Sequence, residues 1–346
     1  MKHIEISIII PTYNRKVQLK RCLESIYNQD YCNDKYEVII VDDGSTDETG
    51  KLLNIFTKQY PNFHCYQQSN RGPAAARNLG IQNAFGIYVV LVDSDCLLSE
   101  NFLKIVASAI REKKNIDAFV GSVIRCFENK FFSPVSEYEK NIAESLTDIE
   151  YDKLTNHAKF HTDCCVVKKE TFEKLDGFDE KFMCDAGEDG DFGFRLLKAG
   201  YKICFLSKAI VYHFERSSIK EMVKRYYNFG CSHCVNYKKH FKNLTILKLP
   251  LNKIIILAHL QSTIYLDINS FKILIFLLTL TIFYNKVGFL FLCLYFVSKY
   301  IKYIIFAKGK GSMKVFISQL SYLYLSEGAC LAGHVAGSIK NKIIYI

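Results

Sequence analysis

Two aspartates one residue apart, Asp93 and Asp95, directly follow the apolar residues 88–92. In an extended segment, residues i and i+2 point to the same side, so both carboxylates can converge on one cation. Carboxylate oxygens favour Mg²⁺ or Mn²⁺ over zinc, and such an ion can bridge a diphosphate. The motif therefore indicates an enzyme with a metal site, although a solvated loop or a helix N-cap also accommodates two such aspartates.

A second acidic motif spans residues 41–47, a turn of sequence VDDGSTD at the end of another apolar run. A carboxylate in this turn can accept a hydrogen bond from a base N–H or a ribose hydroxyl. Ser45 or Thr46 can also cap the following helix, and one turn can do both. A third motif, GEDGDFGFR at residues 187–195, places Glu188 and Asp189 at the start of an amphipathic helix, where acids often serve only as partners of the helix dipole.

The segments that position these motifs alternate between strands and amphipathic helices. This alternation is typical of a doubly wound, mainly parallel α/β sheet with flanking helices. In such sheets ligands bind beyond the carboxyl ends of the strands, so the loops that follow the strands are expected to border one crevice. The predicted strands are residues 6–10, 38–41, 63–67 and 88–92, and the predicted helices are residues 15–27, 46–60 and 74–84.

The composition bounds the function further. The chain has 346 residues, and 49% of them are hydrophobic, which is enough to fill a core and disfavours disorder. Lys and Arg number 45 against 35 Asp and Glu, a net charge of +10. Much of this excess follows Lys198 and alternates with apolar runs, which favours a membrane surface over nucleic acid.

The chain has 13 cysteines, an odd number without the spacing of a disulfide framework. We expect reduced thiols and a cytosolic catalytic part. Cys231 and Cys234 flank His233 and could hold zinc or do redox work, but no second C-x-x-C follows at zinc-ribbon spacing, and buried small apolar residues are the alternative.

The C-terminal part is more hydrophobic than the rest. The apolar runs at residues 273–284, 287–297 and 300–307 are each shorter than the roughly 20 residues of a spanning helix. We expect a helical hairpin that turns at Asn285 and Lys286 and inserts partly or fully into a bilayer, because Lys and Tyr flank the runs. A pair of buried core helices is the alternative, and whether the helices span or dip stays open.

In combination, the motifs resemble the family 2 inverting glycosyltransferases of GT-A fold. The resemblance covers roughly residues 4–215, and the order and spacing of the motifs fit the family. The motifs are residues 9–14 (IIPTYN), 41–47, 70–80 (NRGPAAARNLG), 93–95 (DSD), 174–180 (KLDGFDE) and 187–189 (GED).

The resemblance implies a role for each matching residue. Asp95, with Asp93, would hold Mg²⁺ or Mn²⁺, and His213 is a further candidate ligand, with a packed histidine as the alternative. Asp189 would be the general base, and Glu188 would shape the acceptor pocket. Arg77 would approach the donor phosphates, and the remaining nucleotide-sugar contacts would come from Pro11, Tyr13, Asp43, Asp93 and Ser94.

The chain departs from the family pattern in two places. Cys96 follows Asp95 where many relatives have a further acid, so fewer protein carboxylates are available for the metal. Residues 160–165 (FHTDCC) replace the small-residue turn that relatives place on the acceptor side, which leaves the acceptor contacts there open.

Together these observations predict a catalytic domain at residues 1–215, a basic amphipathic connection at 216–243 and an all-α, hydrophobic, membrane-associated region at 244–346. The predicted function is metal-dependent, inverting transfer of a sugar from a nucleotide diphosphate donor, most commonly UDP in this family, to a lipid-linked or surface glycan. The predicted location is the cell membrane, with the catalytic domain in the cytoplasm. A nucleotidyltransferase and a non-catalytic sugar-nucleotide-binding scaffold are the alternatives.

Overall fold

The computed structural model divides the chain into two compact units. The first unit comprises residues 1–125 and 143–214, and the second comprises residues 126–142 and 215–346. The second division between the units falls after residue 214, whereas the sequence predicted the end of the catalytic domain at residue 215. The described residues are 4–128, 132–133, 135–136, 140, 143–144, 146–151, 160–182, 187–215, 218–240, 245–248, 254–257, 264–267, 295, 313–341 and 344–345.

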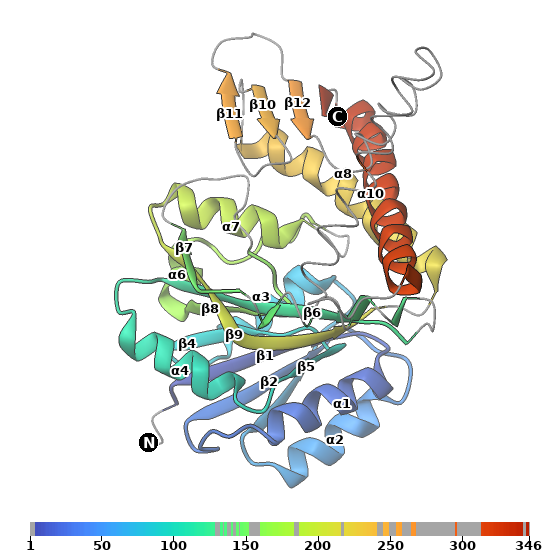
Figure 1. The fold of residues 1–346 in the computed structure, drawn as a ribbon. Coiled ribbons are helices and arrows are strands. Elements are labelled where there is room, and N and C mark those ends of the chain that lie inside the picture. Colours follow the sequence, from blue (N-terminus) through green and yellow to red (C-terminus); the bar gives the residue numbers. More distant parts are fainter. Residues whose placement is uncertain are drawn as a thin grey trace, which may run out of the picture. The chain divides into compact units, whose positions relative to one another are not determined.

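The first unit alternates strands and helices in its N-terminal half, as the sequence predicts (Figure 1). Its elements are β1 (Ile6–Thr12), α1 (Lys16–Tyr27), β2 (Tyr36–Asp42), α2 (Thr49–Gln59), β3 (Phe63–Gln67), α3 (Pro73–Gln82), β4 (Tyr88–Leu91), β5 (Cys96–Leu98), α4 (Phe102–Glu112), β6 (Ala118–Cys126), β7 (Ile149–Tyr151), β8 (Cys165–Lys168), α6 (Lys169–Lys174), α7 (Glu188–Lys198) and β9 (Ile203–Phe214).

These strands form one sheet in the order β3-β2-β1-β4-β8-β6-β9-β5, with β7 paired to β9. The first four strands of that order are parallel, and β1 pairs with both β2 and β4. Four pairs among the other strands, β4 with β8, β6 with β8, β5 with β9 and β7 with β9, are antiparallel.

The predicted mainly parallel sheet is therefore wrong for the second half of this unit, and the sheet is mixed. Parallel neighbours require a crossover connection, which the N-terminal half supplies with α1, α2 and α3. Helices also connect later strands, with α4 between β5 and β6 and α7 between β8 and β9, so the presence of a connecting helix does not by itself set the direction of strand pairing.

Side chains of successive strand residues pack on opposite faces of the sheet, because the side-chain period of a strand is two residues. Ile8 and Ile10 belong to the core shared with α1, α2 and α4, whereas Ile9 belongs to the core shared with α3 and α7. Helices cover both faces, so β1 and β2 are fully buried and consist of nearly continuous apolar residues.

The second unit contains α8 (Ile219–His240), β10 (Thr245–Lys248), β11 (Ile254–Leu257), β12 (Ile264–Asp267), α10 (Met313–Asn341) and β13 (Ile344–Tyr345). Four of these elements form a small sheet in the order β11-β10-β12-β13. The prediction of an all-α C-terminal region is therefore wrong. Short segments rich in β-branched residues, such as Ile254–Leu257 (IIIL), suit a strand as well as a helix, and apolar content alone does not separate the two.

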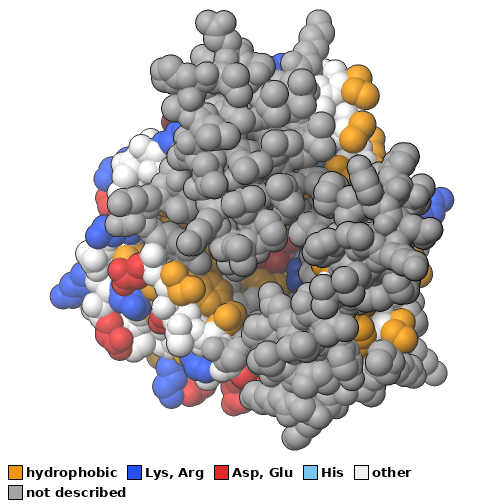
Figure 2. Space-filling view, turned by 45° about the horizontal axis from the view of Figure 1, so that its top comes forward, with side chains coloured by type: hydrophobic (Ala, Val, Ile, Leu, Met, Phe, Trp, Pro, Cys, Tyr) orange, Lys and Arg blue, Asp and Glu red, His pale blue; other side chains and the backbone are white. Residues whose placement is uncertain are grey.

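None of the described helices combines the length and apolar character needed to cross a membrane. The apolar runs 273–284, 287–297 and 300–307, on which the predicted membrane hairpin rests, lie outside the described residues. On the face drawn in Figure 2, the acidic and basic side chains of the described residues are interspersed.

Candidate active site

The loops after β1 and β2 are tied together by one asparagine side chain. Oδ1 of Asn14 accepts hydrogen bonds from the backbone N–H of Thr46 at 2.8 Å and of Asp47 at 3.2 Å. The N–H of Asn14 donates to Oγ of Ser45, and Asn14 adopts a positive φ of 52°, a region that asparagine tolerates better than most residues. The two strand ends therefore form one fixed rim.

Asp43 holds the next loop in place. Its Oδ1 accepts hydrogen bonds from Nε2 of Gln68 at 2.7 Å and from the N–H of Arg71 at 2.8 Å, and its Oδ2 accepts one from the N–H of Gly72 at 2.9 Å. Asp43 is buried, and Gly44 beside it has a φ of +82°. The structure thus gives Asp43 a clear part in shaping the 68–72 loop, and its contact with a nucleotide stays a prediction.

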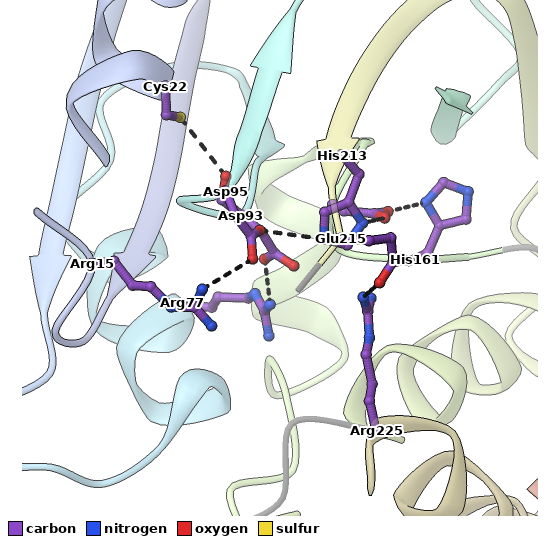
Figure 3. Close-up of polar contacts among 10 residues, drawn as sticks. Arg15, Cys22, Arg77, Asp93, Asp95, His161, His213, Glu215 and Arg225 are labelled. Carbon is purple, nitrogen blue, oxygen red and sulfur yellow. Dashed lines mark hydrogen bonds and ion pairs between the residues drawn. The ribbon is translucent and has the colours of Figure 1, made fainter. Parts of the chain in front are cut away.

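Arg77 on α3 links the D-x-D motif to α7, and Figure 3 draws its contact with Asp93. Its Nη2 lies 2.7 Å from Oδ1 of Asp93, and its Nη1 lies 2.7 Å from Oε1 of Glu188. The guanidinium is almost completely buried, and although burial acts to lower the pKa of Arg77, the two carboxylates outweigh it and raise that pKa. Arg77 is thus a fixed cation between two acids.

Asp95 and His213 come together although they are far apart in the chain. Strands β5 and β9 pair antiparallel with Cys96 opposite His213, and the N–H of Phe214 donates to the carbonyl oxygen of Asp95. As a result, Nε2 of His213 lies 3.3 Å from Oδ1 of Asp95, a contact that Figure 3 draws as a dashed line. The sequence prediction of His213 as a candidate ligand is compatible with this placement.

Asp163, which precedes β8, contacts the other side of the same imidazole. Its Oδ2 lies 3.3 Å from Nδ1 of His213, and its Oδ1 lies 2.5 Å from Nδ1 of His161. Burial acts to raise the pKa of Asp163, but His161 and His213 hold it well below its usual range, so Asp163 is ionised. A carboxylate in this position fixes the orientation of a metal-binding histidine.

The side chains at this point fit a hard divalent cation. Asp95, Cys96 and His213 each offer a donor atom, and these atoms lie within 4.8 Å of one another. For metal–ligand distances of about 2.1 Å, neighbouring ligands of an octahedron are about 3 Å apart, close to the separation of Asp95 and His213. Burial, followed by the charge of Asp95, raises the pKa of Cys96 well above its usual range, so Cys96 stays a thiol and the carboxylate and imidazole remain as donors.

The two acids that open α7 differ in exposure. Glu188 is 3% exposed, burial raises its pKa to about 7 against the opposing effect of Arg77, and its Oε2 accepts no hydrogen bond from the described residues. Asp189 is partly exposed, and burial raises its pKa as well. A raised pKa brings a carboxylate closer to the working pH of a general base.

The other predicted nucleotide-sugar contacts lie on or beside the rim. Tyr13 is 43% exposed at the end of β1, where a flat ring can meet a base. Pro11 is a buried residue of β1 that pairs with Val41, and Ser94 is buried between the two aspartates of the D-x-D motif. The roles of all these residues in binding remain predictions.

Three residues near the D-x-D motif escaped the sequence analysis as functional candidates. They are Arg15, whose Nη1 lies 3.7 Å from Oδ2 of Asp95, and the Asp163 and His161 pair. A signal for the pair existed, because residues 160–165 depart from the family pattern by carrying a histidine and an aspartate.

Comparison with protein families decides the class of the first unit. Residues 7–176 match the model described as "Glycosyl transferase family 2", and residues 151–217 match one described as "N-terminal domain of galactosyltransferase". This chain carries a family 2 glycosyltransferase domain. The matches favour sugar transfer over the nucleotidyltransferase and scaffold alternatives.

Named relatives of this glycosyltransferase domain include the glycosyltransferase GlyG of Streptococcus pneumoniae, which is 31% identical over 179 residues, 49% of this chain and 58% of GlyG. The chain thus spans little more than half the length of that relative. A second is a Methanococcus voltae protein, dolichyl N-acetyl-α-D-glucosaminyl phosphate 3-β-D-2,3-diacetamido-2,3-dideoxy-β-D-glucuronosyltransferase, which is 27% identical over 69% of this chain and 76% of its own length.

Solved structures show the same fold. The mannosyltransferase PcManGT of Pyrobaculum calidifontis, solved with GDP-Man and Mn²⁺, aligns over 96% of this chain and 86% of its own, with a TM-score of 0.55 and 18% identity. TarS of S. aureus, solved with UDP-GlcNAc, aligns over 69% of this chain and 68% of its own, with a TM-score of 0.52 and 21% identity. These likenesses support the GT-A type of architecture predicted for the catalytic domain.

Proposed function

We propose that this chain transfers a sugar from a nucleoside diphosphate donor to a hydroxyl group of a glycan or lipid-linked acceptor, with inversion at the anomeric carbon. The observation that carries the proposal is the 3.3 Å contact between Asp95 and His213, beside an Asp93 that is held by Arg77. This arrangement supplies oxygen and nitrogen donors for Mg²⁺ or Mn²⁺ at the edge of the sheet where such folds bind nucleotides. When bound, the cation offsets the negative charge of the departing diphosphate.

Asp189 is the base in this proposal. As the acceptor oxygen bonds to the anomeric carbon, the bond from that carbon to the diphosphate breaks, and the hydroxyl proton passes to the Asp189 carboxylate. Attack from the face opposite the leaving group inverts the configuration. Glu188 shapes the acceptor pocket in this proposal, which is supported by its position next to Asp189 and by a buried Oε2 that has no hydrogen-bond donor among the described residues.

The nucleotide is a separate part of the proposal. UDP is the expectation from the family, and the structure of TarS with UDP-GlcNAc agrees with it, whereas PcManGT was solved with GDP-Man. Both proteins have the fold of this chain, so the fold does not select the nucleotide base. We propose that side chains after the parallel strands select it, with Tyr13 after β1 and Gln68 after β3 as the candidates. Gln68 is included because Asp43 orients its amide.

For the acceptor, we propose a lipid-linked or surface glycan. The Methanococcus voltae relative is named for a dolichyl phosphate sugar, and another relative, 31% identical over 187 residues, is the minor teichoic acid biosynthesis protein GgaB of Bacillus subtilis. We also propose a location at the cell membrane, from the apolar runs of the sequence, with the catalytic domain in the cytoplasm, from its cysteines without disulfide spacing. Flotation of the full chain with liposomes tests it, and a chain that stays in the soluble fraction without detergent contradicts it.

The first experiment is a thermal-shift panel of uridine, guanosine, thymidine and cytidine diphosphates, each with and without Mn²⁺. Ligand at 100 times its Kd adds about 2.7 kcal/mol, which is roughly 5 to 10 °C in a domain of this size. We expect a metal-dependent shift with one nucleotide, lost in Asp95→Ala and kept in Asp30→Ala, a surface aspartate that pairs with Lys104. A folded wild-type chain that shifts with none of the four overturns the proposal.

A further inference from the structure

A second group of metal-ligating side chains lies in the other unit, between α8 and α10. His233 on α8 faces Cys330 and His334 on α10, and the three donor atoms lie within 4.8 Å of one another. Nδ1 of His233 is 3.1 Å from Nε2 of His334, and Sγ of Cys330 is 3.5 Å from the same Nε2. Cys330 and His334 are one helical turn apart, so both project from one face of α10.

The backbones of the two helices are in direct contact at this point, and this contact fixes the three side chains. A Cβ added at Gly230 would lie 2.0 Å from the carbonyl oxygen of Cys330, and one added at Gly333 would lie 2.0 Å from that of Tyr227. Only glycine allows so close an approach. The helices therefore have a defined separation.

The two thiols of the C-x-x-C motif add to the same contact. Sγ of Cys231 donates to the carbonyl oxygen of Gly333, and Sγ of Cys234 donates to that of His334, both at 3.4 Å. Burial raises the pKa of Cys234 to about 11. The motif that the sequence singled out thus supplies His233 to the donor cluster, while its two cysteines bind the neighbouring helix.

We propose that His233, Cys330 and His334 form a Zn²⁺ site. With Zn–N of about 2.0 to 2.1 Å and Zn–S of about 2.3 Å, tetrahedral geometry separates two nitrogens by about 3.3 Å and a nitrogen from a sulfur by about 3.6 Å. The separations in this cluster, 3.1 Å and 3.5 Å, are close to both values. Two imidazoles and one thiolate suit zinc, unlike the carboxylate-based site around Asp95, which suits Mg²⁺ or Mn²⁺.

Binding has a simple proton balance. The Cys330 thiol releases its proton to solvent and ligates as the thiolate, and the two histidines ligate as neutral imidazoles. Three protein ligands leave the fourth position to water or to another group. Bound zinc would link α8 to α10, since each helix contributes at least one ligand.

The test uses the full chain, stripped of metal by a chelator and titrated with Co²⁺, which reports thiolate ligation by a charge-transfer absorption band. We expect one equivalent of Co²⁺ to produce this band and Zn²⁺ to displace it. The band should disappear in Cys330→Ser. In His233→Gln the apparent affinity for Co²⁺ should fall at least about tenfold. Far-UV circular dichroism checks that both variants are folded.

Two matched variants separate this cluster from the other thiols. Cys96→Ser, beside Asp95, and Cys231→Ser, on the same helix as His233, should both keep the band. Absence of the band in folded wild type overturns the proposal, as does a band that persists in Cys330→Ser or vanishes in Cys96→Ser or Cys231→Ser. None of these outcomes depends on sugar transfer, so the zinc site and the proposed function are tested independently.

Discussion

Nη1 of Arg77 lies 2.7 Å from Oε1 of Glu188, although 111 residues separate them in the chain. The same guanidinium contacts Asp93, so one buried cation fixes the D-x-D motif against the acids that open α7. Both terminal nitrogens of Arg77 already contact carboxylates. The expected approach of Arg77 to the donor phosphates remains a prediction, and the structure adds the positioning of two acids as a further role.

Removing Arg77 should destabilise the fold. Arg77→Ala leaves the buried Glu188 without its cation, and loss of one partner of a buried ion pair costs about 3 to 5 kcal/mol. Urea denaturation of wild type and variant measures the change. The control is Arg71→Ala, because Arg71 pairs with Glu180 at the surface and exposed pairs contribute about 0 to 1 kcal/mol. Equal losses in the free energy of unfolding would show that Arg77 stabilises the fold no more than an exposed ion pair does.

Replacing Asp189 by asparagine should abolish most of the transfer while leaving donor binding intact. The amide cannot accept the proton of the acceptor hydroxyl, and loss of a general base lowers kcat by about 10²- to 10⁴-fold. The measurement is steady-state release of the nucleoside diphosphate, with Glu173→Gln, a surface glutamate on α6, as the control. Full activity in Asp189→Asn would remove Asp189 from the mechanism.

Stability should fall as the pH rises toward neutrality, owing to Glu188. Its pKa is about 7 in the folded chain against an ordinary value of 4.5, mainly because it is buried. Between these two values the folded protein holds a proton that the unfolded chain has released, so the free energy of unfolding decreases with increasing pH. Denaturation at a series of pH values between 4.5 and about 7 measures this dependence. The free energy of unfolding should fall less steeply with pH in Glu188→Gln than in wild type or in Glu173→Gln. An unchanged slope would contradict the raised pKa.

Asp163 should act on the metal through His213. Asp163→Asn removes the charge that orients the imidazole, and loss of such an outer partner lowers metal affinity by about 10- to 100-fold. Mn²⁺ titration in the presence of the nucleotide that binds measures the affinity. His213→Gln should weaken it further, and Asp30→Asn should leave it unchanged. Wild-type Mn²⁺ affinity in a folded Asp163→Asn would reduce its role to packing.

The order of strands and helices in residues 6–92 could be predicted from the sequence because these elements follow from local periodicity, whereas β5 (Cys96–Leu98) was not predicted. The acids after β2 and β4 could also be assigned to one edge of the sheet, since parallel strands place their carboxyl ends together. The structure confirms these elements, with shifts of one to three residues at most ends. The later strands were predicted less well, because antiparallel return along a sheet leaves no periodic signal that separates it from a parallel crossover.

The sequence by itself determined that acidic residues follow the ends of β2 and β4, because a strand and the residues directly after it can be predicted from local periodicity. Only the tertiary structure brought His213 to Asp95, through the pairing of β5 with β9, and Arg77 to Glu188, through the packing of α3 and α7 against one sheet. It also placed His233, within the C-x-x-C segment, beside Cys330 and His334, about 100 residues away, while Cys231 and Cys234 contact the backbone of α10. Contacts of this kind depend on strand register and on glycines at a helix interface, and neither property is encoded in the spacing of the residues that meet.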